Sequence, residues 1–145
     1  MSTRSNIGIQ KEDGTVEVIY CHFDGYPTGV GQELLDNYNS KKLAQDLVDL
    51  GNISGLCESL ELTKQEAYSE KWKHDKMYQE RTQDEEAATK YSSIKKYLDE
   101  IKGNVFIEYI YIYDCVMNQW YSYWADGSKL LLEREIRNYK NRQDW

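Results

Sequence analysis

The chain has 145 residues, 40% of them hydrophobic and 30% charged, and its formal net charge is −7 at pH 7. This length is sufficient for a single domain with a sizeable hydrophobic core. The excess of acidic residues disfavours generic nucleic-acid binding, which requires clustered lysine and arginine side chains that replace the counterions of phosphates. No apolar run approaches the ~20 residues of a membrane-spanning helix.

Cysteine usage and the first residues indicate the compartment. Cys21, Cys57 and Cys115 are far apart and odd in number, which does not predict a disulfide framework. The N-terminal residues lead directly into a β-prone run without a signal-peptide core. We therefore expect a reduced, cytoplasmic environment.

The N-terminal part of the chain is expected to form a β-hairpin. Residues 5–11 and 16–22 are β-prone runs, and Asp13-Gly14 between them favours the positive φ angles of a tight hairpin turn. Toward its end the second run is apolar on both faces, which predicts a central rather than an edge strand.

Two helical patterns follow the hairpin. In the first, four apolar residues share one face at helical spacing: Val30, Leu34, Leu35 and Tyr38. Ser40 is expected to cap a second helix, which Gly51 ends in a left-handed conformation. The irregular stretch 52–62 is expected to pack against the core through its apolar residues, Ile53, Leu56, Cys57 and Leu60.

Residues 63–91 are the most polar part of the chain. Thr63 and Glu66 match a capping box, so a helix is expected to begin at Thr63. Its apolar face is thin and consists of Ala67, Tyr68, Trp72 and Tyr78. Residues 79–89 carry few apolar anchors, which predicts a mobile segment. We interpret 63–91 as a partly helical elaboration of one domain that spans residues 1–145.

The C-terminal third contains the clearest strand of the sequence. A helix capped by Ser92 or Ser93 and ended by Gly103 precedes this strand at 105–113. Strands at 120–124 and 129–132 follow, joined by a turn, and 133–139 is either a last helical turn or an irregular tail. The chain therefore predicts an α+β fold, with a mostly antiparallel sheet of about five strands in two hairpins, packed against three to four helices.

The segment 20–31 is the most distinctive string and the first candidate site. His22 and Asp24 leave a strand, and Gly29 and Gly31 lie at the start of a helix, where free amides favour anions. In a functional interpretation, Asp24 orients the imidazole, and His22 and the amides bind a phosphate or carboxylate. In a structural one, Asp24 caps the turn and Gly25 supplies a positive φ. Both stay open, and the candidate ligand-binding residues are His22, Asp24, Gly25, Tyr26, Gly29 and Gly31.

The second candidate site is an aromatic sheet face. The chain has 13 Tyr and 4 Trp against 2 Phe, and these residues suit half-buried surfaces and interfaces. Alternation along the strand at 105–113 places its tyrosines on one face, and the neighbouring strand is expected to extend the row. The candidate partner-binding residues are Tyr109, Tyr111, Tyr113, Trp120, Tyr121 and Tyr123. The alternative is that helices cover this face and the hydroxyls reach its rim.

Other chemistry has weaker support in the sequence. Cys21 and His22 are adjacent in a strand and point to opposite faces, so they suit neither a shared metal ion nor a thiolate–imidazole pair. His74 lies in the polar stretch. Glu108 could meet another carboxylate across the sheet for acid–base chemistry, but most such residues only face water. We predict no catalytic residue, metal or cofactor, and the sequence favours a non-enzymatic protein.

The N-terminal residues also carry a resemblance. The strings TRSNIGI at 3–9, EDGT at 12–15 and IYCHFDGYP at 19–27 resemble the opening of an uncharacterised family of small accessory proteins encoded by bacteriophages and prophages. In that family Trp often stands where this chain has Phe23. The resemblance covers about the first 55 residues and, more loosely, Trp120 and Tyr121. It implies a bacterial cytoplasmic setting and carries over no catalytic residues.

Three functions are compatible with these patterns. The leading hypothesis is a non-enzymatic accessory protein that binds and blocks a host or host-defence protein. The alternative is a protein that sequesters or hydrolyses a nucleotide or another small anion at the loop of His22 and Asp24. A homodimer that buries the tyrosine face is the third.

Overall fold

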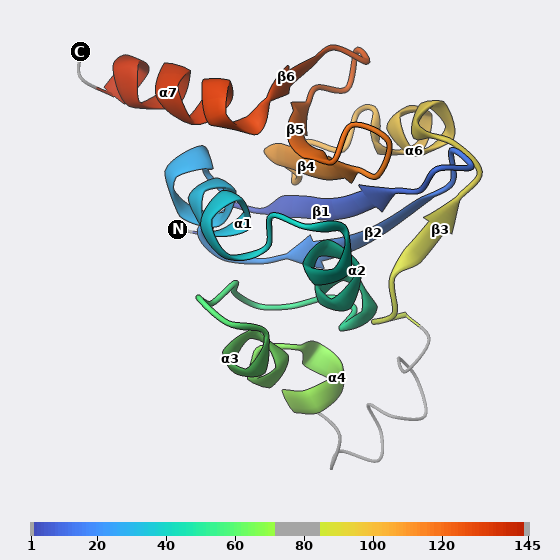
Figure 1. The fold of residues 1–145 in the computed structure, drawn as a ribbon, viewed down its shortest axis with the longest axis vertical. Helices are drawn as coiled ribbons and strands as arrows, with labels where there is room; N and C mark the ends of the chain where they lie inside the picture. The colour runs from blue at the N-terminus through green and yellow to red at the C-terminus, as the bar shows by residue number, and fades with distance from the viewer. Residues whose placement is uncertain (1, 72–84, 144–145) are drawn as a thin grey trace.

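The computed structural model describes residues 2–71 and 85–143, and it contains one sheet. Its six strands are β1 (Ser5–Gln10), β2 (Val16–Cys21), β3 (Thr89–Tyr91), β4 (Tyr109–Asp114), β5 (Gln119–Tyr123) and β6 (Lys129–Leu131). Their spatial order is β3-β2-β1-β4-β5-β6 (Figure 1). The α+β class is thereby confirmed, with one strand more than expected.

The sheet is antiparallel except at its centre. β1 pairs with β2 in antiparallel register and with β4 in parallel register, so that Ser5 lies beside Tyr109 and Gln10 beside Asp114. This parallel pairing joins the two expected hairpins into one sheet. β2 is a central strand as predicted, because β3 pairs with its other edge.

The start of β4 and the presence of β3 differ from the sequence expectation. β4 begins at Tyr109 and not at residue 105, because residues 102–108 form a loop. At the end of this loop, the Glu108 amide donates to the carbonyl of Arg4, the residue before β1, at 3.0 Å. β3 was not expected. It has three residues and a mixed polar sequence, so no alternating pattern indicates it.

The helical elements are η1 (Pro27–Gly31, a π-helical turn), α1 (Gln32–Asn37), α2 (Lys41–Asp49), α3 (Leu60–Gln65), α4 (Tyr68–Lys71), α6 (Ile94–Ile101) and α7 (Leu132–Gln143). Ser40 and Ser93 cap α2 and α6 through their side-chain oxygens, as expected. Gly51 and Gly103 adopt positive φ angles after these helices, at 79° and 87°.

The polar stretch begins differently from the prediction. Ser59, not Thr63, caps α3, and its side chain accepts from the Leu62 amide at 3.3 Å. Thr63 is buried within the helix, where its hydroxyl bonds to the Cys57 amide and the Tyr38 hydroxyl. At the C-terminus α7 replaces the short turn or irregular tail expected there. Trp72, His74, Tyr78 and the N-terminal half of the segment expected to be mobile lie outside the described residues.

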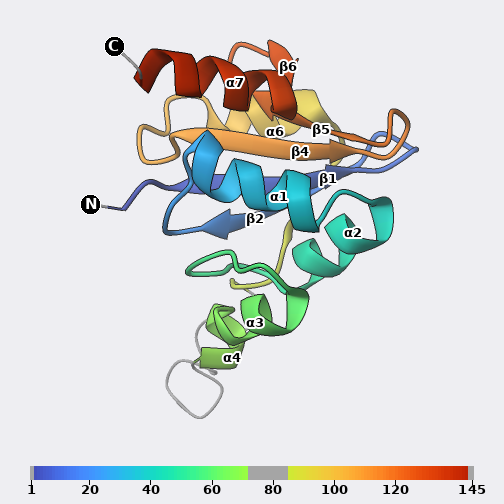
Figure 2. The same cartoon turned by 60° about the vertical axis from the view of Figure 1, so that its left-hand side comes forward.

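Helices cover both faces of the sheet (Figures 1 and 2). The face that meets η1, α1, α2 and α7 is formed by Ile7, Ile9, Ile19, Cys21, Tyr111, Tyr113 and Trp120. The opposite face packs against α6 and is formed by Val16, Val18, Ile110, Ile112 and Tyr123. Within the described residues, no helix has the length and hydropathy needed to cross a membrane.

Buried phenols and a buried thiol predict a stability that decreases in alkali. Burial raises the pKa of Tyr123 and of the Cys21 thiol to about 12, and raises that of Tyr111 well above its usual value. The folded state therefore retains protons that the unfolded chain releases, from about pH 9 for cysteine and about pH 10 for tyrosine. Their stabilising contribution is complete below those values and is lost as the pH rises toward 12.

We expect urea denaturation, followed by circular dichroism, to show a lower midpoint at about pH 11 than at about pH 8. The Tyr123→Phe variant should lose part of this difference, because phenylalanine has no phenolic proton to release. Equal midpoints at the two pH values would contradict the prediction.

Candidate functional site

His22 lies directly after β2, where it is half-buried and bonded to a neighbouring tyrosine. Its Nδ1 atom shares a hydrogen bond of 2.7 Å with the hydroxyl of Tyr20. Asp24 is exposed, and in the described part of the chain no hydrogen bond or ion pair joins it to His22. The expectation that Asp24 orients the imidazole is therefore wrong. Tyr20 does so, because residues two apart in a strand share a face.

The loop glycines are accounted for by close packing. Asp24, not Gly25, supplies the positive φ angle of this turn, at 59°. A Cβ atom on Gly25 would lie 2.7 Å from the Thr3 carbonyl, and one on Gly29 would collide with the Asp24 carbonyl. A Cβ atom on Gly31 would lie 3.3 Å from the Cδ1 atom of Leu132. Gly25 and Gly29 are therefore required by backbone packing whether or not a ligand binds, whereas an alanine at Gly31 would meet side chains, of which that of Leu132 is the nearest.

The amides at the start of η1 are engaged within the loop itself. The Gly29 amide donates to the Tyr26 carbonyl at 2.9 Å, and the Val30 amide donates to the Asp24 carbonyl at 2.8 Å. The Gly25 carbonyl accepts from the Tyr111 hydroxyl at 2.7 Å. These two amides are consequently unavailable to an anion, which weakens the functional interpretation of the loop.

A cluster of Ser54, Glu66 and Lys71 lies next to the loop that follows β2, residues 22–26, which we call the His22 corner. The Ser54 hydroxyl donates to Glu66 Oε2 at 2.6 Å, and Lys71 Nζ lies 2.8 Å from Ser54 Oγ and 2.9 Å from Glu66 Oε2. Hydrogen bonds from Ser54 and Lys71 lower the pKa of the Glu66 carboxyl. Ser54 is only 4% exposed, and the Phe23 amide donates to its carbonyl at 2.9 Å. The cluster therefore fastens α4 to the corner rather than presenting a nucleophile.

The tyrosine row does not form one open surface. Tyr111, Tyr113 and Trp120 are buried under the helices of one face. Tyr121 and Tyr123 pair with Ile112 and Ile110, so they lie on the other face, and the expectation that they extend the row is wrong. The alternative, that helices cover this face, is correct for Tyr111 and Tyr113, whereas Tyr109 at the start of β4 is half-buried.

Tyr26 and Tyr109 contact the C-terminal helix. The ring of Tyr26 stacks on Tyr139 of α7 at 6.3 Å between centroids, and Tyr109 meets the same ring edge-on at 6.5 Å. Both candidate residues thus hold α7 against the sheet. Their half-buried rings lie at the end of the sheet where β1 and β4 begin.

This end of the sheet also carries an exposed apolar surface that was not recognised in the sequence. We call Phe23, Val105, Phe106 and Trp124 the apolar end; their side chains are 49%, 82%, 64% and 42% exposed. Phe23 follows β2, Val105 and Phe106 precede β4, and Trp124 follows β5; the strand register brings these three positions to the same end of the sheet. Val105 and Phe106 belong to the β-prone run at 105–113, so the sequence predicts a strand there and not an exposed loop.

Arg4 connects the apolar end to the His22 corner. Its guanidinium carbon lies 5.6 Å from the centroid of the Phe106 ring. The guanidinium also contacts the hydroxyl of Tyr20. The pKa of Tyr20 is raised, because the effect of burial is larger than the opposing effect of Arg4. Because Tyr20 bonds to His22 and the His22 ring meets Phe23 at 4.5 Å, a continuous row runs from Phe106 to Phe23.

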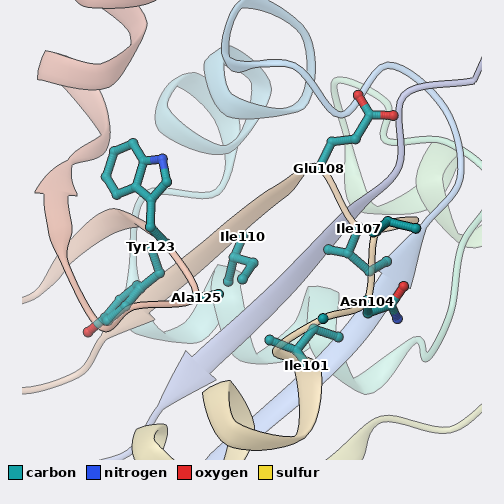
Figure 3. Close-up of a pocket in the computed structure, with 10 residues that line it drawn as sticks. Ile101, Asn104, Ile107, Glu108, Ile110, Tyr123 and Ala125 are labelled. Carbon is teal, nitrogen blue, oxygen red and sulfur yellow. The ribbon is translucent and has the colours of Figure 1, made fainter.

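A pocket of about 240 Å³ opens beside this row, between α6, β4 and β5. We call it the Trp124 pocket. It is lined by Ile101, Gly103, Asn104, Val105, Ile107, Glu108, Ile110, Tyr123, Trp124 and Ala125. Figure 3 shows Ile101, Ile107 and Ile110 around the opening, with Glu108 at the rim and its carboxylate turned outward. The pocket therefore has an apolar floor and a charged rim, a combination typical of binding sites.

No protein-family model matches the chain, and no curated protein and no solved structure is significantly similar to it. The geometry of the apolar end and the Trp124 pocket is therefore the basis on which we assign a function.

Proposed function

We propose that this chain is a non-enzymatic protein that binds another protein through the apolar end and the Trp124 pocket. One observation carries the proposal: four large apolar residues, each at least 42% exposed, lie at one end of the sheet, and two of them, Val105 and Trp124, line a pocket. Exposed apolar patches of this kind mark interaction surfaces, because leaving them in water is unfavourable. Aromatic anchors that enter pockets supply much of the affinity at such interfaces.

The resemblance of the N-terminal motifs to small phage-encoded proteins supports a more specific form of this proposal. In that setting the partner is a protein of the bacterial host or of its defence against phages, and binding blocks the partner. We do not propose the small-anion alternative, since the Gly29 and Val30 amides are already hydrogen-bonded within the loop.

The chain offers a matched pair of variants for testing the surface. Val105→Ser/Phe106→Ser removes two exposed apolar side chains from the apolar end. Val116→Ser/Met117→Ser removes two of comparable exposure, 65% and 54%, from the β4–β5 turn at the opposite end of the sheet. We expect a stoichiometric partner, captured from bacterial lysate by the parent chain, to be lost with the first variant and retained with the second.

Light scattering on the same proteins measures their oligomeric state and thereby tests the homodimer hypothesis. A parent chain that is dimeric, with a monomeric Val105→Ser/Phe106→Ser variant, would identify the apolar end as a contact between two copies. Equal capture by both variants would contradict the proposed function. Equal melting temperatures of the two variants are the control for folding.

A further inference from the structure

The Trp124 pocket has a single charged group in its lining. Of the ten lining residues only Glu108 is charged, and its side chain is exposed at the rim (Figure 3). Among residues 2–71 and 85–143, no lysine, arginine or histidine lies within ion-pair distance of this carboxylate. An unpaired carboxylate beside an apolar floor favours ligands that are both apolar and cationic.

The cations nearest to the pocket lie outside its lining. Arg4 precedes β1, and its guanidinium lies over the Phe106 ring and bonds to Tyr20. Lys102 and Asp126, which adjoin lining residues in the chain, have opposite charges. Lys129 Nζ lies 4.5 Å from the centroid of the Tyr121 ring and 5.8 Å from that of the lining Tyr123, so this cation is held over aromatic rings. Glu108 is therefore the one charged side chain that lines the pocket itself, and a cationic group of a ligand would meet it at the rim.

We propose that the Trp124 pocket takes a large apolar side chain of a basic protein, and that Glu108 pairs with a lysine or arginine next to that side chain in the partner. The inference rests on the proposed function and specifies the partner's chemistry. A volume of about 240 Å³ accommodates one aromatic or large aliphatic side chain. The net charge of −7 attracts a basic partner over a longer range, which favours encounter.

Three small probes with the same ring and different charges test the preference directly. Phenethylamine is cationic, 2-phenylethanol is neutral and 3-phenylpropionate is anionic at neutral pH. Each is titrated into the full chain, and binding is followed by NMR through the amides of Ile107 and Ile110 and the indole N–H of Trp124. At low salt we expect phenethylamine to bind about two- to fivefold more tightly than 2-phenylethanol, the range of an exposed ion pair, and 3-phenylpropionate to bind most weakly.

The Glu108→Gln variant removes the charge and keeps the shape of the side chain. It should bind the three probes with equal affinity, whereas Glu58→Gln, an exposed acidic position outside the pocket, should keep the preference. Absence of any ring binding at the pocket, or equal affinities in the parent chain, would overturn the inference. These outcomes are separate from the proposed function, which fails if the parent chain captures no partner or if the Val105→Ser/Phe106→Ser variant still captures it.

Discussion

Replacing Trp120 with alanine is expected to lower the free energy of unfolding by about 3–5 kcal/mol. The side chain is 1% exposed and lies on the face of the sheet covered by α1, α2 and α7. Its indole N–H donates to the Tyr38 carbonyl at 3.0 Å, and its ring meets Tyr113 edge-on at 5.4 Å. The substitution thus leaves a large cavity and removes a buried hydrogen bond. Urea denaturation followed by circular dichroism measures the loss.

Trp124→Ala is the matched control, because it deletes the same side chain from the other end of β5. Trp124 is 42% exposed at the apolar end, so its removal leaves no buried cavity. We expect it to change the free energy of unfolding by less than about 1 kcal/mol. A Trp120→Ala protein as stable as the Trp124→Ala protein would show that the sheet face is not packed as described.

Gly51→Ala is the second substitution with a large expected effect. Gly51 follows α2 with a φ angle of 79°, a conformation that costs an alanine roughly 1–2 kcal/mol. An added Cβ atom would also collide with the backbone carbonyl of Glu86, which accepts from the Asn52 amide at 2.7 Å. Because this carbonyl belongs to backbone and not to a flexible side chain, the segment that leads to β3 has to shift. We expect a total loss of about 2–4 kcal/mol.

Gly55→Ala provides the control for Gly51. Gly55 lies four residues further along the chain, without a positive φ angle and with open space where a Cβ atom would be built. Its replacement should leave the free energy of unfolding within about 0.5 kcal/mol of the parent value. Equal stabilities of the two alanine variants, measured by urea denaturation, would contradict the contact between Gly51 and the segment before β3.

Local patterns were sufficient wherever a segment is shaped by its own neighbours. Asp13-Gly14 indicated the first hairpin, Ser40 and Ser93 indicated the starts of α2 and α6, and Gly51 indicated the end of α2. These signals involve hydrogen bonds and φ angles within a few residues. They failed for β3 and for the start of β4, where pairing with a distant strand decides the boundary.

For the candidate sites too, local patterns predicted some features and strand pairing decided the others. The sequence singled out segment 20–31; in the structure Gly25 and Gly29 are closely packed against backbone carbonyls, and Tyr20 rather than Asp24 contacts the imidazole. For the tyrosines, alternation placed Tyr109, Tyr111 and Tyr113 on one face, whereas the register between β4 and β5 had to be known to place Tyr121 and Tyr123 on the other.

By itself, the sequence determined the α+β class, the central hairpin, the caps of two helices and the apolar alternation of β4, since each depends on residues close together in the chain. Only the tertiary structure decided that β1 pairs in parallel with β4. That pairing places Arg4 beside the loop of Phe106 and Glu108, about a hundred residues away, and so forms the apolar end and the Trp124 pocket. Strand pairing over such distances depends on how all the apolar faces are buried together, and no local periodicity encodes it.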